Sequence, residues 1–108
     1  MKIAITGASG FIGKKVIEEL AGKTEIIALT RSISIEQTTE DVRWVQTDYS
    51  VELLSEQFHG VDVVIHLAAV RGVSGNIADY HSNECLTENI LIAMGNSGVR
   101  HIVFASSI

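Results

Sequence analysis

The segment TGASGFIG near the start of the chain constrains the fold more than any other feature. Its three glycines stand at positions 7, 10 and 13, directly after the short apolar run Lys2–Thr6. Beyond them, apolar residues at positions 12, 16 and 20 recur every four residues. That spacing predicts an amphipathic helix over residues 11–21, closed by Gly22. The glycines therefore lie where a strand passes into a helix.

In this strand–turn–helix context, the glycine triplet predicts a binding site for the diphosphate of a dinucleotide. Gly7 would permit the sharp turn, Gly10 would let the backbone approach the phosphates without a Cβ in the way, and Gly13 would let the helix pack closely on the sheet. Free N–H groups at the helix start, with the positive end of the helix dipole, would face the phosphates. The alternative is that the glycines only terminate a strand, and the surrounding pattern disfavours it.

Strands and helices alternate along the rest of the chain. We expect strands over residues 25–30, 43–47, 61–68 and 101–105, and helices over residues 51–58 and from about 79 to 96. The segment VDVVIHLA, residues 61–68, is almost continuously apolar, which is typical of a strand buried on both faces in a parallel sheet. Leu86, Ile90 and Met94 form one stripe of the last helix. These patterns predict an α/β fold, a doubly wound parallel sheet of Rossmann type, as one domain over residues 1–108.

Composition narrows the class of protein further. Hydrophobic residues make up 46% of the chain and charged residues 19%, as in soluble globular domains. The net charge of −5 argues against nucleic-acid binding. Cys85 is the only cysteine of the chain, and none of the four histidines shows metal-ligand spacing with it. The sequence has no membrane-length apolar run and no signal-peptide core, so we expect a cytoplasmic protein without bound metal.

The spelling TGxxGxxG resembles the extended branch of the short-chain dehydrogenase/reductase superfamily, the NAD(P)-dependent epimerases and dehydratases of nucleotide sugars. The resemblance runs through all 108 residues, and Asp48-Tyr49 matches the position that contacts adenine in the family. The segment HLAAVR matches the family's segment beside the ribose and nicotinamide, YHSN matches its helix motif, and VFASS matches the strand that carries the catalytic serine or threonine. Leu86 replaces a glycine of the family's pattern in the last helix. The glycine turn and the resemblance together imply a set of cofactor-binding residues: Gly7, Ser9, Gly10, Phe11, Ile12, Gly13, Arg31, Ser32, Asp48, Tyr49, Leu67, Ala68, Ala69, Arg71, Asn83 and Ser106.

The residues after the second strand favour NADP over NAD. An NAD-binding domain of this type usually places a carboxylate there to accept from the ribose 2′-hydroxyl. This chain has Thr30, Arg31 and Ser32 instead. An arginine can hold a 2′-phosphate that a carboxylate would repel. The alternative is that Arg31 is an ordinary solvated loop charge.

The resemblance also implies a serine that holds the reacting group, a general acid/base tyrosine and a lysine four residues after that tyrosine. Ser107 matches the serine, but neither tyrosine is followed by lysine: the fourth places after Tyr49 and Tyr80 hold Leu53 and Glu84. We therefore expect a partial chain, truncated after about five strands, that does not catalyse as given. In full length it would act on a nucleotide sugar. Two alternatives are a non-catalytic NAD(P)-binding or redox-sensing module and a non-functional remnant.

The last expected strand has a further consequence. If the chain stops with the apolar run HIVFASSI, that strand forms an uncovered edge of the sheet. Uncovered apolar edges pair with other chains. We therefore expect self-association.

Overall fold

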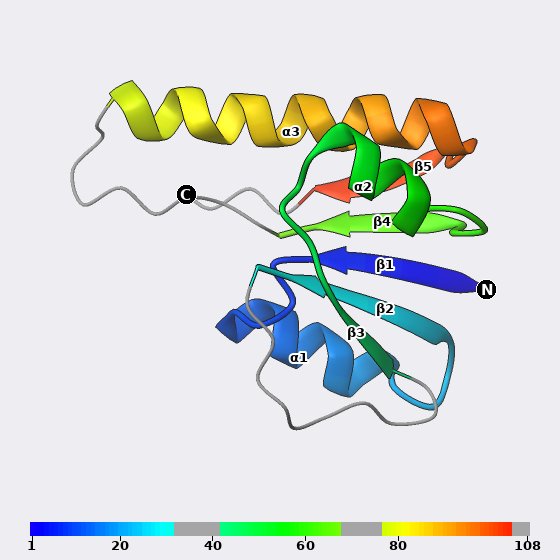
Figure 1. Cartoon of the computed structure of the whole chain (residues 1–108). Coiled ribbons are helices and arrows are strands. Elements are labelled where there is room, and N and C mark those ends of the chain that lie inside the picture. Colours follow the sequence, from blue (N-terminus) through cyan, green and yellow to red (C-terminus); the bar gives the residue numbers. More distant parts are fainter. Residues whose placement is uncertain (32–41, 68–76, 105–108) are drawn as a thin grey trace.

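The chain folds into a parallel sheet with helices on both faces (Figure 1). The computed structural model describes residues 1–31, 42–67 and 77–104, and for residues 77–83 it describes the backbone only. The strands of this described part are β1 (Lys2–Thr6), β2 (Glu25–Thr30), β3 (Val42–Gln46), β4 (Val63–His66) and β5 (His101–Phe104). Their order in the sheet is β3-β2-β1-β4-β5, and each neighbouring pair is parallel. This confirms the predicted Rossmann-type fold.

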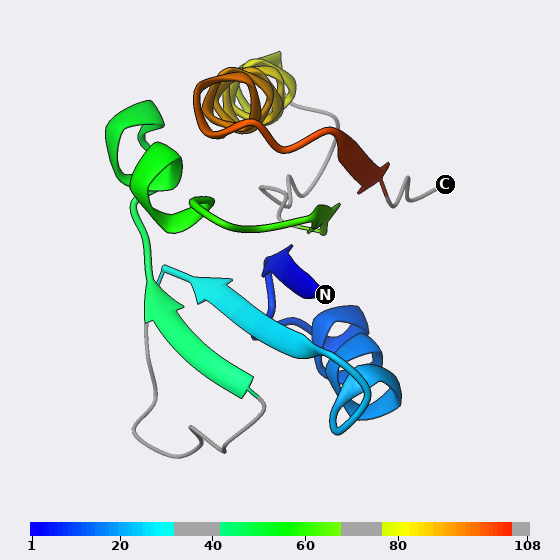
Figure 2. The ribbon, with the colours of Figure 1, turned by 90° about the vertical axis from the view of Figure 1, so that its right-hand side faces the viewer.

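The helices lie on opposite sides of the sheet. The helix α1 (Phe11–Leu20) covers one face, while α2 (Val51–Gln57) and α3 (Ile77–Ser97) cover the other (Figure 2). Strand β4 therefore has one core cluster on each side: Val64 belongs to the cluster under α2 and α3, and Val63 and Ile65 pack against the other. The prediction that this strand is covered on both faces is confirmed.

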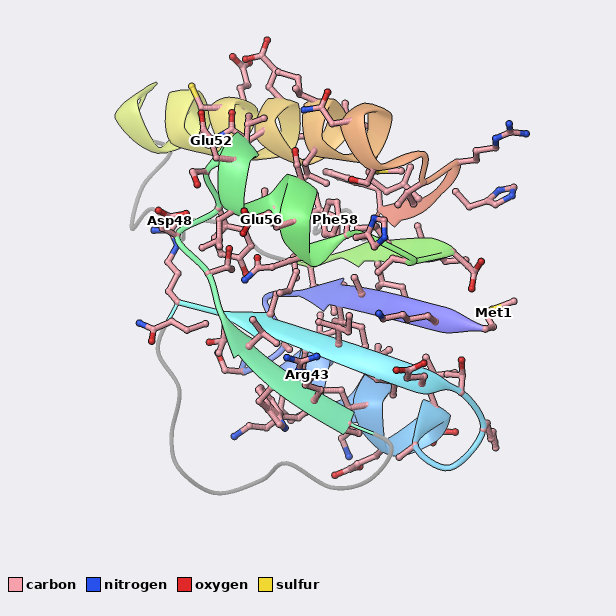
Figure 3. All side chains as sticks on the ribbon, turned by 45° about the vertical axis from the view of Figure 1, so that its right-hand side comes forward. Met1, Arg43, Asp48, Glu52, Glu56 and Phe58 are labelled. Atoms are coloured by element: carbon pink, nitrogen blue, oxygen red, sulfur yellow. The ribbon has the colours of Figure 1, made fainter. Side chains whose placement is uncertain are left out.

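The core under α2 and α3 is built from large apolar side chains. Phe58, the residue that caps α2, is completely buried between that helix and the sheet (Figure 3). The predicted stripe of α3 is confirmed, because Leu86, Ile90 and Met94 are all buried. Burying side chains of this size stabilises a fold by roughly 1.5–3 kcal/mol each.

On the other face, the packing stripe of α1 differs from the one predicted. Val16, Ile17 and Leu20 pack against the core, but Ile12 is 53% exposed. Gly13 is the residue of the first turn that meets the strand-to-helix turn, and helix positions three, four and seven residues after it share its face. Position 12 is about a quarter of a turn away from that face, so the expectation that Ile12 is part of the buried stripe was wrong.

The predicted boundaries differ most at β4. Residues 61–68 were expected as a strand, but the ladder covers only Val63–His66. The N–H of Val61 donates to the carbonyl of Phe58 and so closes the turn after α2. Asp62 then exchanges two bonds with Lys2: its N–H donates to the Lys2 carbonyl at 2.8 Å, and its carboxylate accepts from the Lys2 N–H at 2.8 Å. Residues 61 and 62 thus belong to the turn after α2, and the strand pairing of β4 begins only at Val63.

Candidate functional site

The turn between β1 and α1 lies at the carboxyl end of the sheet, where the chain order reverses. Strand β1 pairs with β2 on one side and with β4 on the other. In Figure 1 the chain leaves the arrowhead of β1 and bends back into α1 below the sheet. In open α/β sheets, ligands bind at this kind of switch point, outside the carboxyl ends of the strands.

Gly7 makes the bend of this turn. Its φ is +67°, a left-handed conformation that L side chains rarely adopt. Its carbonyl accepts from the N–H of Gly10 at 3.1 Å, and the next residue, Ala8, donates its N–H to the Leu29 carbonyl at 3.2 Å. The turn is thus closed on itself and attached to the end of β2.

Gly10 and Gly13 have different surroundings. A Cβ placed on Gly13 would lie 2.6 Å from the Gly7 carbonyl oxygen and 2.7 Å from that of Ala8, both backbone atoms. A Cβ on Gly10 would lie 3.4 Å from the Gly7 carbonyl oxygen, an ordinary contact. Gly13 is therefore required by the packing of α1 on the turn. The fold itself leaves room for a side chain at Gly10, so a need for glycine there would come from a bound molecule.

The start of α1 has no side-chain cap. Gly10 is the N-cap residue and, without a side chain, supplies no side-chain acceptor for the N–H groups of the first helical turn. Such groups have no partner within a helix, and they carry the positive end of its dipole. Phe11 and Ile12 in that turn are 75% and 53% exposed. An anion placed over this turn would meet backbone donors without displacing a side chain.

Tyr49 reaches the turn from the segment after β3. Its hydroxyl accepts a hydrogen bond from the N–H of Gly7 at 2.9 Å and donates one to the Leu29 carbonyl at 3.3 Å. The residue is 3% exposed, and burial raises the pKa of its phenol above the usual 10. Sequence reasoning placed Tyr49 at the adenine end, and that contact stays a prediction. It missed the bond to Gly7, because nothing in the local pattern marks a pair 42 residues apart.

Arg31 lies beside Tyr49 at the end of β2. Its guanidinium carbon is 5.3 Å from the centre of the Tyr49 ring, and its carbonyl accepts from the Gln46 side-chain amide at 3.1 Å. An open depression adjoins it, lined by Arg31, Gln46, Thr47, Asp48 and Leu53. The Arg31 guanidinium and the Asp48 carboxylate thus share one hollow at the edge of the sheet where β2 and β3 end.

Asp48 is the acidic member of that hollow. It lies on the connection from β3 to α2 (Figure 3), and its carboxylate accepts from the Ser50 N–H at 2.9 Å. Hydrogen bonds from Ser50 hold the pKa of Asp48 below its usual 3.8. The carboxylate is therefore ionised at neutral pH and keeps lone pairs for another donor.

Thr30 and Ser9 join the end of β2 to the turn. The buried Thr30 hydroxyl donates to the Ser9 hydroxyl at 3.1 Å. Thr30 stands where a ribose-binding carboxylate would be expected for NAD, and this bond turns its side chain toward the turn. Sequence reasoning identified the missing acid but not this contact.

His66 forms a buried polar link at the end of β4. Its Nδ1 lies 2.8 Å from the Thr6 hydroxyl and its Nε2 lies 3.2 Å from the Thr87 hydroxyl. The Thr6 hydroxyl also accepts from the N–H of Leu67 at 3.0 Å. Burial lowers the pKa of His66, so the ring is neutral at pH 7. The link joins β1, β4 and α3 directly beneath the carboxyl edge, a role that sequence reasoning did not assign.

The structure brings one part of the predicted site together and leaves another part undescribed. Gly7, Ser9, Gly10 and Gly13 form the turn with Phe11 and Ile12, while Arg31 and Asp48 share the neighbouring hollow. Six predicted residues lie outside the described residues: Ser32, Ala68, Ala69, Arg71, Ser106 and Ser107. For Asn83 the backbone lies within α3, but its side chain is not among those described.

Within the described residues, no helix has the length and apolar character that crossing a membrane requires. In the same three ranges, histidine, cysteine, aspartate and glutamate side chains form no group of three that could hold a metal ion.

Comparison with known proteins agrees with this geometry. A solved structure of UDP-N-acetylglucosamine 4-epimerase from Bacillus cereus is 41% identical, with a TM-score of 0.86, over 99% of this chain and 35% of that one. GDP-mannose 3,5-epimerase 1 from Oryza sativa subsp. japonica is 32% identical over 99% of this chain and 31% of its own length. A 2-alkyl-3-oxoalkanoate reductase from Stenotrophomonas maltophilia is 29% identical over 99% of this chain and 33% of its own.

The chain thus spans about a third of the length of these relatives. The model of the NAD dependent epimerase/dehydratase family matches residues 3–108, and the match includes all of the glycine turn and the hollow beside it. On this evidence the chain belongs to the NAD dependent epimerase/dehydratase family.

Proposed function

We propose that the chain is the NAD(P)-binding part of a nucleotide-sugar epimerase, dehydratase or reductase, in which hydride passes between the substrate and the bound nicotinamide. The observation that carries this proposal is the turn from β1 to α1. It combines a left-handed Gly7, a Gly13 pressed against backbone, an open position at Gly10 and an uncapped helix start at the switch point of the sheet. These features suit a diphosphate.

The surroundings of the turn suit the two ends of a dinucleotide. The diphosphate would lie over the backbone of Gly10 and the first turn of α1, where a side chain at position 10 would obstruct it. The adenosine half would then lie toward the hollow, with the Asp48 carboxylate accepting from the adenine amino group. The hydroxyls of Ser9 and Thr30 lie between these two places and are bonded to one another.

We further propose that NADP is preferred to NAD. Support comes from Arg31, which is exposed at the end of β2 and held over the Tyr49 ring. A guanidinium there could bind two oxygens of the 2′-phosphate at once, since its N–H donors have a fixed planar arrangement. Thr30, which stands in place of a carboxylate, adds no negative charge that would repel the phosphate.

The proposed substrate class is a nucleotide sugar, acted on by the full-length protein. Support comes from the two epimerases named above, whose substrates are UDP- and GDP-linked sugars. Ser107 would hold the reacting hydroxyl or carbonyl only in combination with a tyrosine and a lysine four residues later, a pair that residues 1–108 do not contain. We therefore propose that residues 1–108 bind the cofactor without turning over substrate.

Calorimetric titration of folded protein with NAD⁺, NADH, NADP⁺ and NADPH tests the proposal. We expect saturable binding of at least one dinucleotide, with NADPH tighter than NADH. Free inorganic pyrophosphate should compete, because the turn contacts the diphosphate and not a base. Absence of heat from all four dinucleotides at millimolar concentration would refute the cofactor assignment, and a tighter NADH would refute the preference alone.

A further inference from the structure

The phenol of Tyr49 is the only side chain that the structure shows bonded to the N–H of Gly7, within the described residues. That N–H belongs to the residue with the left-handed φ of +67°, on which the bend of the turn depends. The same phenol donates to the Leu29 carbonyl, which also accepts from the N–H of Ala8. Two consecutive N–H groups of the turn are thus fixed by one phenol and one carbonyl.

The backbone of Tyr49 is itself held in an unusual conformation. Its φ is +59°, and it is the only non-glycine residue with a positive φ in the described part of the chain. Its N–H donates to the Thr47 hydroxyl at 3.1 Å, and its carbonyl accepts from the Asn89 side-chain amide at 3.0 Å. A conformation of this kind is unfavourable for a residue with a side chain and persists only where the surroundings impose it.

The remaining contacts keep the phenol aimed at the turn. The Tyr49 ring is buried, and the guanidinium carbon of Arg31 lies over it, 5.3 Å from the centre of the ring. Burial keeps the hydroxyl protonated, so it can donate to Leu29 while it accepts from Gly7. Tyr49 therefore connects α3, through Asn89, with the bend of the turn.

We propose that Tyr49 is a positioning residue: its hydroxyl holds the N–H of Gly7 and so keeps the turn in the conformation that accepts a diphosphate. This inference rests on the proposed dinucleotide binding for its consequence, but the restraint on Gly7 exists without any ligand. Loss of the hydroxyl leaves a part-buried N–H without its partner, which is costly. The turn would then spend more time in conformations whose amides do not converge on a phosphate.

The substitution Tyr49→Phe removes the hydroxyl and keeps the ring beneath Arg31. Two quantities are measured in the wild type and the variant: the hydrogen-exchange rate of the Gly7 amide without ligand, and the dissociation constant of NADPH by calorimetry. We expect Gly7 exchange to rise about tenfold and NADPH binding to weaken about tenfold, the effect of one lost hydrogen bond. The exchange rates of the β1 and β2 amides should change much less.

Ser55→Ala is the matched control. It also removes one hydroxyl that accepts a side-chain hydrogen bond, from Asn96 at 3.1 Å, but at the contact between α2 and α3. It should leave both Gly7 exchange and NADPH affinity unchanged. An equal loss of affinity in both variants would show a general effect of reduced stability and overturn the proposal.

The remaining outcomes are also decisive. Unchanged Gly7 exchange and unchanged affinity in Tyr49→Phe would overturn the positioning role. A wild type that binds no dinucleotide refutes the proposed function, while Gly7 exchange still decides whether Tyr49 restrains the turn. If Tyr49→Phe does not fold, Gly7 exchange in the wild type decides. Protection of the Gly7 amide comparable to that of the β1 amides supports the proposal, and exchange at the rate of an unprotected loop amide overturns it.

Discussion

Gly13 lies so close to Gly7 that a Cβ at position 13 would be 2.6 Å from the Gly7 carbonyl oxygen. The third glycine of the motif thereby determines how near α1 approaches the turn. The contact is between backbone groups, so no side-chain movement can relieve it. This distinguishes Gly13 from Gly10, whose surroundings within the protein would accept a methyl group.

We predict that Gly13→Ala destabilises the protein by about 1–3 kcal/mol, because the added methyl group forces α1 away from the turn. Gly95→Ala is the control. Gly95 lies within α3, and a methyl group added there would extend into open space, so alanine should stabilise the helix by about 0.5–1 kcal/mol. Chemical denaturation of the two variants measures both changes. Equal stability of Gly13→Ala and wild type would contradict the packing argument.

For Arg31, the prediction concerns cofactor preference. Arg31→Ala should weaken NADPH binding at least about tenfold more than NADH binding, because only the 2′-phosphate loses its partner. Arg43→Ala is a matched control, since Arg43 is an exposed cation on β3 away from the hollow (Figure 3). It should change neither affinity much. Equal losses for both cofactors in Arg31→Ala would remove the case for NADP.

A pH dependence is expected from His66. Its folded pKa lies below the ordinary 6.5, so the unfolded chain binds the proton more tightly than the folded chain. The free energy of unfolding should therefore fall as the pH drops below about 6.5, and level off below the folded pKa. Protonation also reverses the direction of one of the bonds to Thr6 and Thr87, since both ring nitrogens then donate and the hydroxyl that donated must turn to accept.

Denaturation at about pH 7.5 and about pH 5.5 measures this effect. His66→Asn removes the titrating group and should reduce the difference in stability between the two values. His59→Asn changes an exposed histidine after α2 and should keep the wild-type difference. A pH dependence that is the same in His66→Asn and wild type would show that other groups cause it.

The edge strand β5 leads to a prediction about assembly. It pairs with β4 on one side, and its residues Val103 and Phe104 are 54% and 55% exposed. Exposed apolar strands at a sheet edge pair with other chains. We expect sedimentation to show association that grows with concentration and that Val103→Lys reduces. Leu91→Lys, at an equally apolar exposed site on α3, should reduce it less. A wild-type chain that stays monomeric over a wide concentration range would contradict this prediction.

The fold was largely predictable because its signals are local. Apolar runs mark the elements, glycines follow β1 and the helices, and the strands β1 and β2 begin and end where expected. Glycines also mark the helix ends: Gly22, Gly60 and Gly98 all have positive φ and follow α1, α2 and α3 closely. The exposed position of Ile12 was not predictable from periodicity alone, because the orientation of α1 depends on the contact of Gly13 with the turn.

The site was predictable only in part, for a related reason. The glycine turn is contiguous in sequence, so its residues could be identified together. The bonds of Tyr49 to Gly7 and of His66 to Thr6 join residues 42 and 60 positions apart. Such pairs are created by the order of strands in the sheet, and a single sequence carries no pattern that specifies them.

Backbone amide resonances during titration with NADPH test the central claim most directly. We predict that the largest saturable shifts occur at residues 10–13, where the amides of the turn and of the first turn of α1 would meet the diphosphate. In Gly10→Ala, which should fold normally because its methyl group has room, these shifts should require a much higher NADPH concentration. Resonances of residues 10–13 that do not move at millimolar NADPH, or shifts confined to other parts of the chain, would contradict the account.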